Sequence, residues 1–124
     1  MVKILGMVEH SMLPLYYSAS DLVFVPYRLE QLNEGSVTIE AFACARPVVA
    51  FKRGLTTQTE QRGGFLVEDD PRVGGETLLR YLRRPAFLSE KGREAKALAS
   101  EFSLETAGRT LENIYSRVLE AGDE

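Results

Sequence analysis

Four short apolar runs separated by helical patterns constrain the fold more than any other feature of this chain. They lie at 2–6, 22–26, 47–51 and 64–67, with the sequences VKILG, LVFVP, PVVAF and GFLV. Each run is continuous in Val, Leu, Ile and Phe instead of alternating with polar residues. Such runs are typical of strands that are buried on both faces of a parallel sheet. The sequence therefore predicts an α/β domain.

Helical patterns separate and follow these runs. We expect helices at 12–20 and 36–45, a short one near 56–61, and three more at 74–84, 86–102 and from 103 onward. Ser103 is predicted to cap the last helix. The apolar residues of this last helix recur at helical spacing and are predicted to face the core: Leu104, Ala107, Leu111, Ile114 and Val118.

No repeat or linker divides the 124 residues, so we expect a single domain spanning 1–124. Its predicted architecture is a Rossmann-like three-layer sandwich, with a mostly parallel sheet of about four strands flanked by helices. No apolar run reaches the roughly 18 to 20 residues needed to cross a bilayer, and no secretory leader is evident. We therefore expect a cytoplasmic protein without a transmembrane segment.

Charge and residue counts exclude several classes of site. The net charge is −3 and no basic run contains interleaved aromatic residues, so nucleic acid is not an expected partner. The only cysteine, Cys44, cannot form an internal disulfide and is interpreted as a small hydrophobe on a helix face. The only histidine, His10, excludes sites that need two histidines. Asp69 and Asp70 precede Pro71 and are predicted to form a turn, not a metal site.

Two carboxylates, Glu34 and Glu40, flank the predicted start of the helix at 36–45. In a parallel sheet such a helix start lies at the carboxyl ends of the strands, where ligands bind. Gly35 and Ser36 would offer unpaired N–H groups and the positive end of the helix dipole to a phosphate. Carboxylates fit beside a phosphate only if they accept hydrogen bonds from hydroxyl groups. A sugar nucleotide supplies both kinds of group.

The same residues also fit a structural role. Acidic side chains near a helix N-terminus gain roughly 0.3 to 1 kcal/mol from the dipole without any ligand. Ser36 equally suits an N-cap position. Both roles can coexist in one helix, and the spacing of the two glutamates does not separate them.

Three segments carry a resemblance to a known family, and together they span nearly the whole chain. They are ILGMVEHSMLPLYYSASDLVFVPYRLEQLNEGSVTIEAFACARPVVAF, GGFLVEDDP and EFSLETAGRTLENIY. Their order and spacing resemble the C-terminal half of a retaining GT-B glycosyltransferase of the group 1, glycogen-synthase-like family. The resemblance implies that Glu34 and Glu40 belong to the EX7E motif of that family, in which the first glutamate contacts the donor sugar and the second contacts the nucleotide ribose. It also implies that the intervening backbone faces the sugar and diphosphate: Gly35, Ser36, Val37 and Thr38.

This chain departs from the family pattern in two respects. Five residues separate Glu34 from Glu40, two fewer than in the motif. An alternative register places Leu32 at the first-glutamate position, with Glu30 as a nearby substitute. The chain also lacks the acceptor-binding domain and the first two strands of the donor-binding domain, which carry a basic pair for the diphosphate. The strand at 2–6 then either pairs beside 22–26 or needs another chain, so we expect a homo-oligomer or a partner subunit.

The resemblance implies that this chain is the donor-binding part of a glycosyltransferase. The complete enzyme would transfer a glycosyl group to an acceptor hydroxyl with retention of configuration. The nucleotide sugar is the substrate, and no cofactor or metal is implied. We expect the isolated chain to be catalytically incompetent and assign no catalytic residue. The alternative is a non-catalytic interaction module that keeps the fold for assembly without a ligand.

Overall fold

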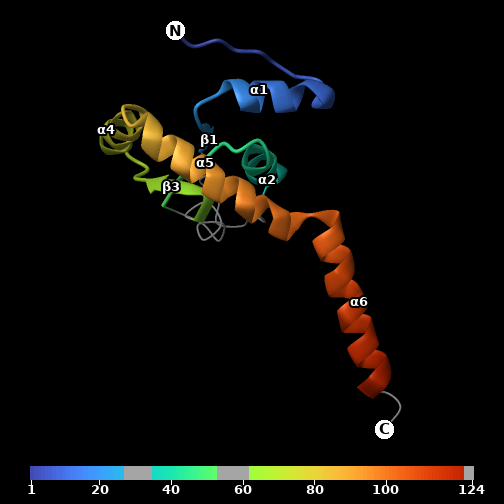
Figure 1. Ribbon diagram of the computed structural model, residues 1–124. Coiled ribbons are helices and arrows are strands. Elements are labelled where there is room, and N and C mark those ends of the chain that lie inside the picture. Colours follow the sequence, from blue (N-terminus) through green and yellow to red (C-terminus); the bar gives the residue numbers. More distant parts are fainter. Residues whose placement is uncertain (27–34, 53–61, 122–124) are drawn as a thin grey trace.

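A small parallel sheet lies between helices in the computed structural model, which describes residues 1–26, 35–52 and 62–121 (Figure 1). The α/β class predicted from the sequence is confirmed. In chain order the elements are η1 (His10–Met12), α1 (Leu13–Ala19), β1 (Val23–Val25), α2 (Ser36–Ala43), β2 (Val48–Phe51), β3 (Gly64–Val67), α4 (Pro71–Leu82), α5 (Pro85–Ala99), η2 (Ser100–Phe102) and α6 (Leu104–Ala121).

The sheet has the strand order β1-β2-β3, and both pairings are parallel. Val48 of β2 lies opposite Val23 of β1 and Gly64 of β3. The three predicted strands at 22–26, 47–51 and 64–67 are therefore present and neighbours in sequence order. The predicted short helix near 56–61 lies outside the described residues.

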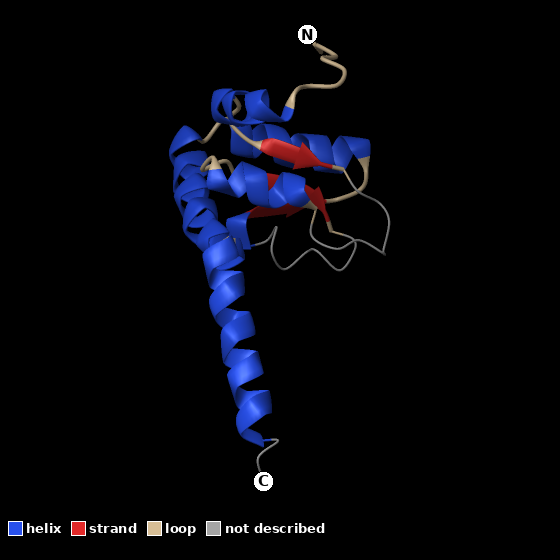
Figure 2. Ribbon diagram, turned by 90° about the vertical axis from the view of Figure 1, so that its right-hand side faces the viewer, coloured by secondary structure: helices blue, strands red, loops and turns tan. Residues whose placement is uncertain are grey.

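The strand predicted at 2–6 does not form. Val2 and Ile4 are 90% and 91% exposed, and the segment joins no sheet. Helix α1 lies between this segment and β1 (Figures 1 and 2). Apolar residues favour a strand only where a neighbouring strand and a face to pack on are available, and among the described residues this segment has neither. The sheet thus has three described strands instead of about four, and the free edge of β1 has no partner strand among the described residues.

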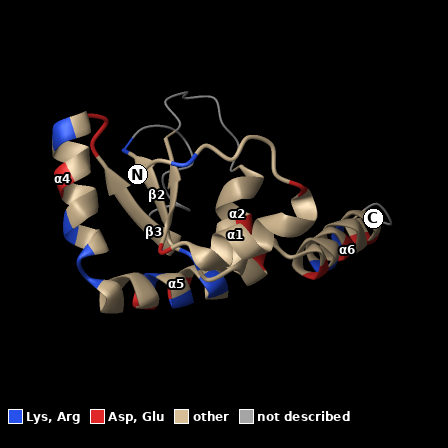
Figure 3. Cartoon of the chain, turned by 90° about the horizontal axis from the view of Figure 1, so that it is seen from above, with Lys and Arg blue, Asp and Glu red and all other residues tan. Residues whose placement is uncertain are grey.

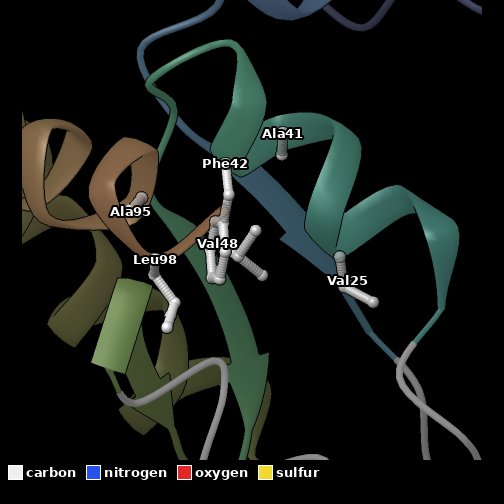
Figure 4. Packing of buried hydrophobic residues seen from close by; sticks show 6 residues of the cluster. All are labelled: Val25, Ala41, Phe42, Val48, Ala95 and Leu98. Carbon is white, nitrogen blue, oxygen red and sulfur yellow. The ribbon is translucent and has the colours of Figure 1, made fainter. Parts of the chain in front are cut away.

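The core consists of two clusters, one on each face of the sheet. Val48 and Val49 of β2 are completely buried and point to opposite faces. The first cluster joins β1 and β2 to α2 and α5 (Figure 4): Val25, Ala41, Phe42, Val48, Ala95 and Leu98. The second joins β2 and β3 to α5, with side chains of α4 against it: Val49, Phe65, Val67 and Leu88. Helices therefore cover both faces, which is why the central strand is apolar throughout.

The turn between α2 and β2 is a Schellman motif closed by an unusual residue. The Arg46 amide donates to the Ala41 carbonyl at 2.9 Å, and the Ala45 amide donates to that of Phe42 at 2.8 Å. Ala45 has a φ of 56°, in the left-handed region that glycine normally occupies in this motif. Helix α5 approaches this turn closely, because a Cβ on Gly92 would lie 2.3 Å from the Ala45 oxygen.

The apolar stripe of the last helix is not part of the core, so this prediction is wrong. Figures 1 and 2 show α6 extending away from the rest of the chain. Leu111, Ile114 and Val118 are between 51% and 63% exposed, and Leu104 is 92% exposed. The predicted cap is confirmed, since the Ser103 hydroxyl accepts from the Thr106 amide at 3.1 Å. Helical spacing identifies an apolar face but does not say what covers it. None of the described residues covers this face of α6.

Charges of both signs are interspersed along α4, α5 and α6 (Figure 3). Some form local ion pairs, as Lys91 does with Glu94 on α5 and Arg109 with Glu105 on α6. Among the described residues no helix is long and apolar enough to cross a membrane.

Ala45→Gly is expected to stabilise the protein. Glycine removes the steric cost of the left-handed conformation, and the gain should be about 0.5 to 1 kcal/mol after the greater freedom of glycine in the unfolded state is subtracted. Urea unfolding measures the change. Ala97→Gly, at an exposed helical position of α5, should instead cost up to about 1 kcal/mol. Destabilisation by Ala45→Gly would contradict the left-handed assignment.

Ile114→Ser on α6 is expected to change the free energy of unfolding by no more than about 0.5 kcal/mol, because the side chain is half exposed. Leu98→Ala in the first cluster should cost about 2 to 5 kcal/mol, since that side chain is 5% exposed. Thermal unfolding at low protein concentration compares the two. A loss above about 1 kcal/mol for Ile114→Ser would mean that the stripe is covered.

Candidate functional site

The N-terminus of helix α2 lies at the carboxyl edge of the sheet. No described side chain caps it, so its first amides are open to a ligand. Gly35 occupies the N-cap position with extended dihedrals, and Ser36 is the first helical residue. The predicted start at Ser36 is thus confirmed, whereas Ser36 is not the N-cap. The Thr38 amide donates to the Gly35 carbonyl at 3.0 Å. The Ser36 and Val37 amides precede the first intrahelical hydrogen bond, as in any helix, and are the donors that a ligand could use.

The predicted site residues of this segment differ in accessibility. Ser36 is exposed, and Gly35 and Val37 are half-buried, with Val37 packed against the first cluster. Thr38 is 1% exposed, so its side chain faces the interior. Glu34 lies outside the described residues, as do Glu30 and Leu32 of the alternative register. Of the predicted site residues between the two glutamates, Gly35, Ser36 and Val37 have backbone that a ligand can reach, whereas Thr38 does not.

Glu40 lies half-buried at the fifth position of α2 and is bonded to α1. The Tyr17 hydroxyl donates to its Oε2 at 2.9 Å. Both residues line a pocket of about 150 Å³ between the two helices, together with His10, Leu13, Pro14, Ala43 and Cys44. Tyr17 also packs against the first cluster. The sequence did not predict the hydrogen bond from Tyr17 to Glu40, because no local pattern relates residues 23 positions apart.

One polar contact ties the C-terminal end of α1 to the turn before β2, and two more cap that end. The Arg46 guanidinium donates to the Ser18 carbonyl at 2.8 Å. The Ser20 amide and hydroxyl both donate to the Tyr17 carbonyl, at 3.1 and 2.8 Å. These contacts close the C-terminal end of a helix of only seven residues. The carbonyl of Tyr17 is therefore bonded to Ser20, and its hydroxyl is bonded to Glu40.

The carboxyl ends of β2 and β3 are joined by charged groups. The Lys52 ammonium pairs with the Glu68 carboxylate, and both side chains are about half exposed. Asp70 caps α4 by accepting from the Arg72 and Val73 amides at 2.9 Å. The predicted turn at Asp69–Asp70 is therefore confirmed, and Asp70 has a structural role. In the described ranges, no group of three or more His, Cys, Asp or Glu residues could hold a metal ion.

Three kinds of comparison relate this chain to known proteins. A family model described as "Glycosyl transferases group 1" matches residues 1–84. D-inositol 3-phosphate glycosyltransferase of Salinispora arenicola is 36% identical over 112 residues, which cover 88% of this chain and 25% of that protein. Lipopolysaccharide core biosynthesis mannosyltransferase LpsB of Rhizobium meliloti is 26% identical over 123 residues, covering 94% of this chain and 34% of that protein.

The same relationship holds at the level of structure. Sucrose-phosphate synthase from Thermosynechococcus elongatus superposes with a TM-score of 0.78 and 29% sequence identity, over 94% of this chain and 30% of that one. The chain thus spans roughly a quarter to a third of the length of the proteins that it matches.

Proposed function

The chain belongs to the group 1 glycosyl transferase family, and we propose that it contributes the donor-binding part of a retaining enzyme of this family. The fold is similar to that of the GT-B glycosyltransferases. The donor would be a nucleoside diphosphate sugar, and the complete enzyme would pass its glycosyl group to an acceptor hydroxyl. The observation that carries the proposal is that one helix, α2, presents both the open amides of Ser36 and Val37 and the carboxylate of Glu40.

The geometry of an α-helix brings these two groups to one ligand. Ser36 and Glu40 are four residues apart and therefore lie on the same face of α2, separated by about 6 Å along its axis. Side chains of a helix generally lean toward its N-terminus, which would favour an approach of the Glu40 carboxylate to a ligand bound at these amides. A diphosphate at the amides would place the attached ribose within reach of Glu40, which accepts hydrogen bonds from hydroxyl groups.

Each residue has a definable task in such a reaction. The Ser36 and Val37 amides, with the positive end of the α2 dipole, would stabilise the negative charge that develops on the departing diphosphate. Glu40 would fix the ribose, and Glu34 would contact the donor sugar, as the family motif implies. Thr38 would not contact the donor directly, because the residue is 1% exposed and its amide already donates to the Gly35 carbonyl. None of these residues would bind the acceptor. The isolated chain would therefore bind the donor but transfer little of its glycosyl group.

A second candidate function is assembly without a ligand. Two observations favour it: the free edge of β1 has no partner strand among the described residues, and the apolar stripe of α6 is uncovered by them. Both surfaces would suit a missing domain, a partner subunit or a second copy of the chain. They are equally compatible with donor binding, so nucleotide affinity decides between the two functions.

Calorimetric titration with UDP and GDP, and with their glucose and mannose conjugates, tests the donor site. We expect saturable binding of at least one series. Glu40→Ala should weaken it by about 1 to 3 kcal/mol, or roughly 5- to 150-fold, as for a lost hydrogen bond to a charged group. Glu90→Ala, on the exposed face of α5, is the matched control and should bind as the wild type does. No saturable binding at millimolar ligand would overturn the proposal in favour of the assembly function.

A further inference from the structure

The hydrogen bond between Tyr17 and Glu40 has no place in the family motif, yet it joins the donor-binding helix to α1. We propose that Tyr17 is a positioning residue, whose hydroxyl holds one oxygen of the Glu40 carboxylate so that the other is presented to the ribose hydroxyls of the donor. This inference rests on the proposed function, in which Glu40 binds the ribose. It adds a residue from a different helix to that site.

The Tyr17 hydroxyl engages one of the two oxygens of the Glu40 carboxylate. Tyr17 donates to Oε2 at 2.9 Å, a normal length for a hydroxyl bonded to a carboxylate. An ionised carboxylate has about four acceptor positions on its two oxygens. Within the part of the chain that the structure describes, this bond therefore leaves Oε1 available, while it restricts rotation about the side-chain torsions of Glu40. Ordering a glutamate side chain on binding costs rotamer entropy, and the bond to Tyr17 means that part of this order is already present in the folded protein.

Tyr17 can position Glu40 only if it is itself fixed, and three contacts fix it. Its ring packs against the first core cluster. Its carbonyl accepts from both the amide and the hydroxyl of Ser20. The next carbonyl along the chain, that of Ser18, is held by Arg46. The phenol has few torsions to lose, so the hydroxyl acts as a rigid donor. Such preorganisation raises affinity by lowering the entropy lost on binding.

The surroundings of the pair strengthen the bond. Leu13, Pro14 and Ala43 supply apolar walls to the pocket that Tyr17 and Glu40 line. Both residues are half-buried, so less water competes for the carboxylate than at an exposed site. A hydrogen bond in such surroundings is stronger than one in open water. A purely structural link between α1 and α2 would explain the bond equally well, and the test must therefore separate affinity from stability.

Tyr17→Phe removes the hydroxyl and keeps the ring. Tyr16→Phe is the matched control, because Tyr16 is 45% exposed and lies next to Tyr17 on α1. Each variant is titrated with UDP, GDP and their 2′,3′-dideoxy analogues, and thermal unfolding is recorded in parallel. We expect Tyr17→Phe to weaken binding of the ribonucleotide about three- to tenfold and to leave binding of the dideoxy analogue unchanged. In a Glu40→Gln background, Tyr17→Phe should cause no additional loss.

A ligand-independent measurement accompanies the titrations. The side-chain carboxyl 13C signal of Glu40 should move in Tyr17→Phe and stay in place in Tyr16→Phe. The inference is overturned if the wild type binds the ribonucleotide and Tyr17→Phe binds it equally well, or loses the same factor for the dideoxy analogue. Failure of the wild type to bind any of these nucleotides is a different result. It would overturn the proposed function, and the role of Tyr17 in donor binding with it.

Discussion

Complete burial of the central strand is the constraint on which the rest of the structure depends. Val48 and Val49 of β2 point to opposite faces of the sheet and have no exposed surface. Both faces must therefore be covered, by α2 and α5 on one side and by α4 and α5 on the other. Because β1 and β2 are parallel, the helix that connects them must return from the carboxyl edge of the sheet to its amino edge. The open start of α2 consequently lies at the edge where ligands bind.

Helix α2 serves the core and the candidate site at the same time. Ala41 and Phe42 are fully buried in the first cluster, whereas Glu40, next to them in sequence, is bonded to Tyr17 on α1. The helix ends in the left-handed turn at Ala45, against which Gly92 brings α5. Core packing thus sets the position of α2, and with it the relation between the open amides and the carboxylate. Substitutions in this part of the core are expected to alter the site as well as stability.

Local patterns predicted what depends on local chemistry. The strands at 22–26, 47–51 and 64–67, the start of α2 at Ser36 and the cap at Ser103 all follow from residue type and spacing. The strand at 2–6 and the core role of the α6 stripe were wrong, because an apolar pattern does not specify the surface that covers it. The bond from Tyr17 to Glu40 depends on the packing of α1 against α2, which no local pattern contains. The role of Glu34, outside the described residues, stays a prediction.

The central claim is that the N-terminus of α2 and the Glu40 carboxylate form one binding site for a nucleoside diphosphate. Amide NMR spectra recorded during titration with UDP or GDP test it most directly. The account predicts that the largest shifts fall on Ser36 and Val37, with smaller ones at Glu40 and Tyr17. Shifts concentrated on α4 or α6, or at the opposite edge of the sheet around Arg46 and Arg93, would contradict it. So would spectra that do not change at millimolar ligand.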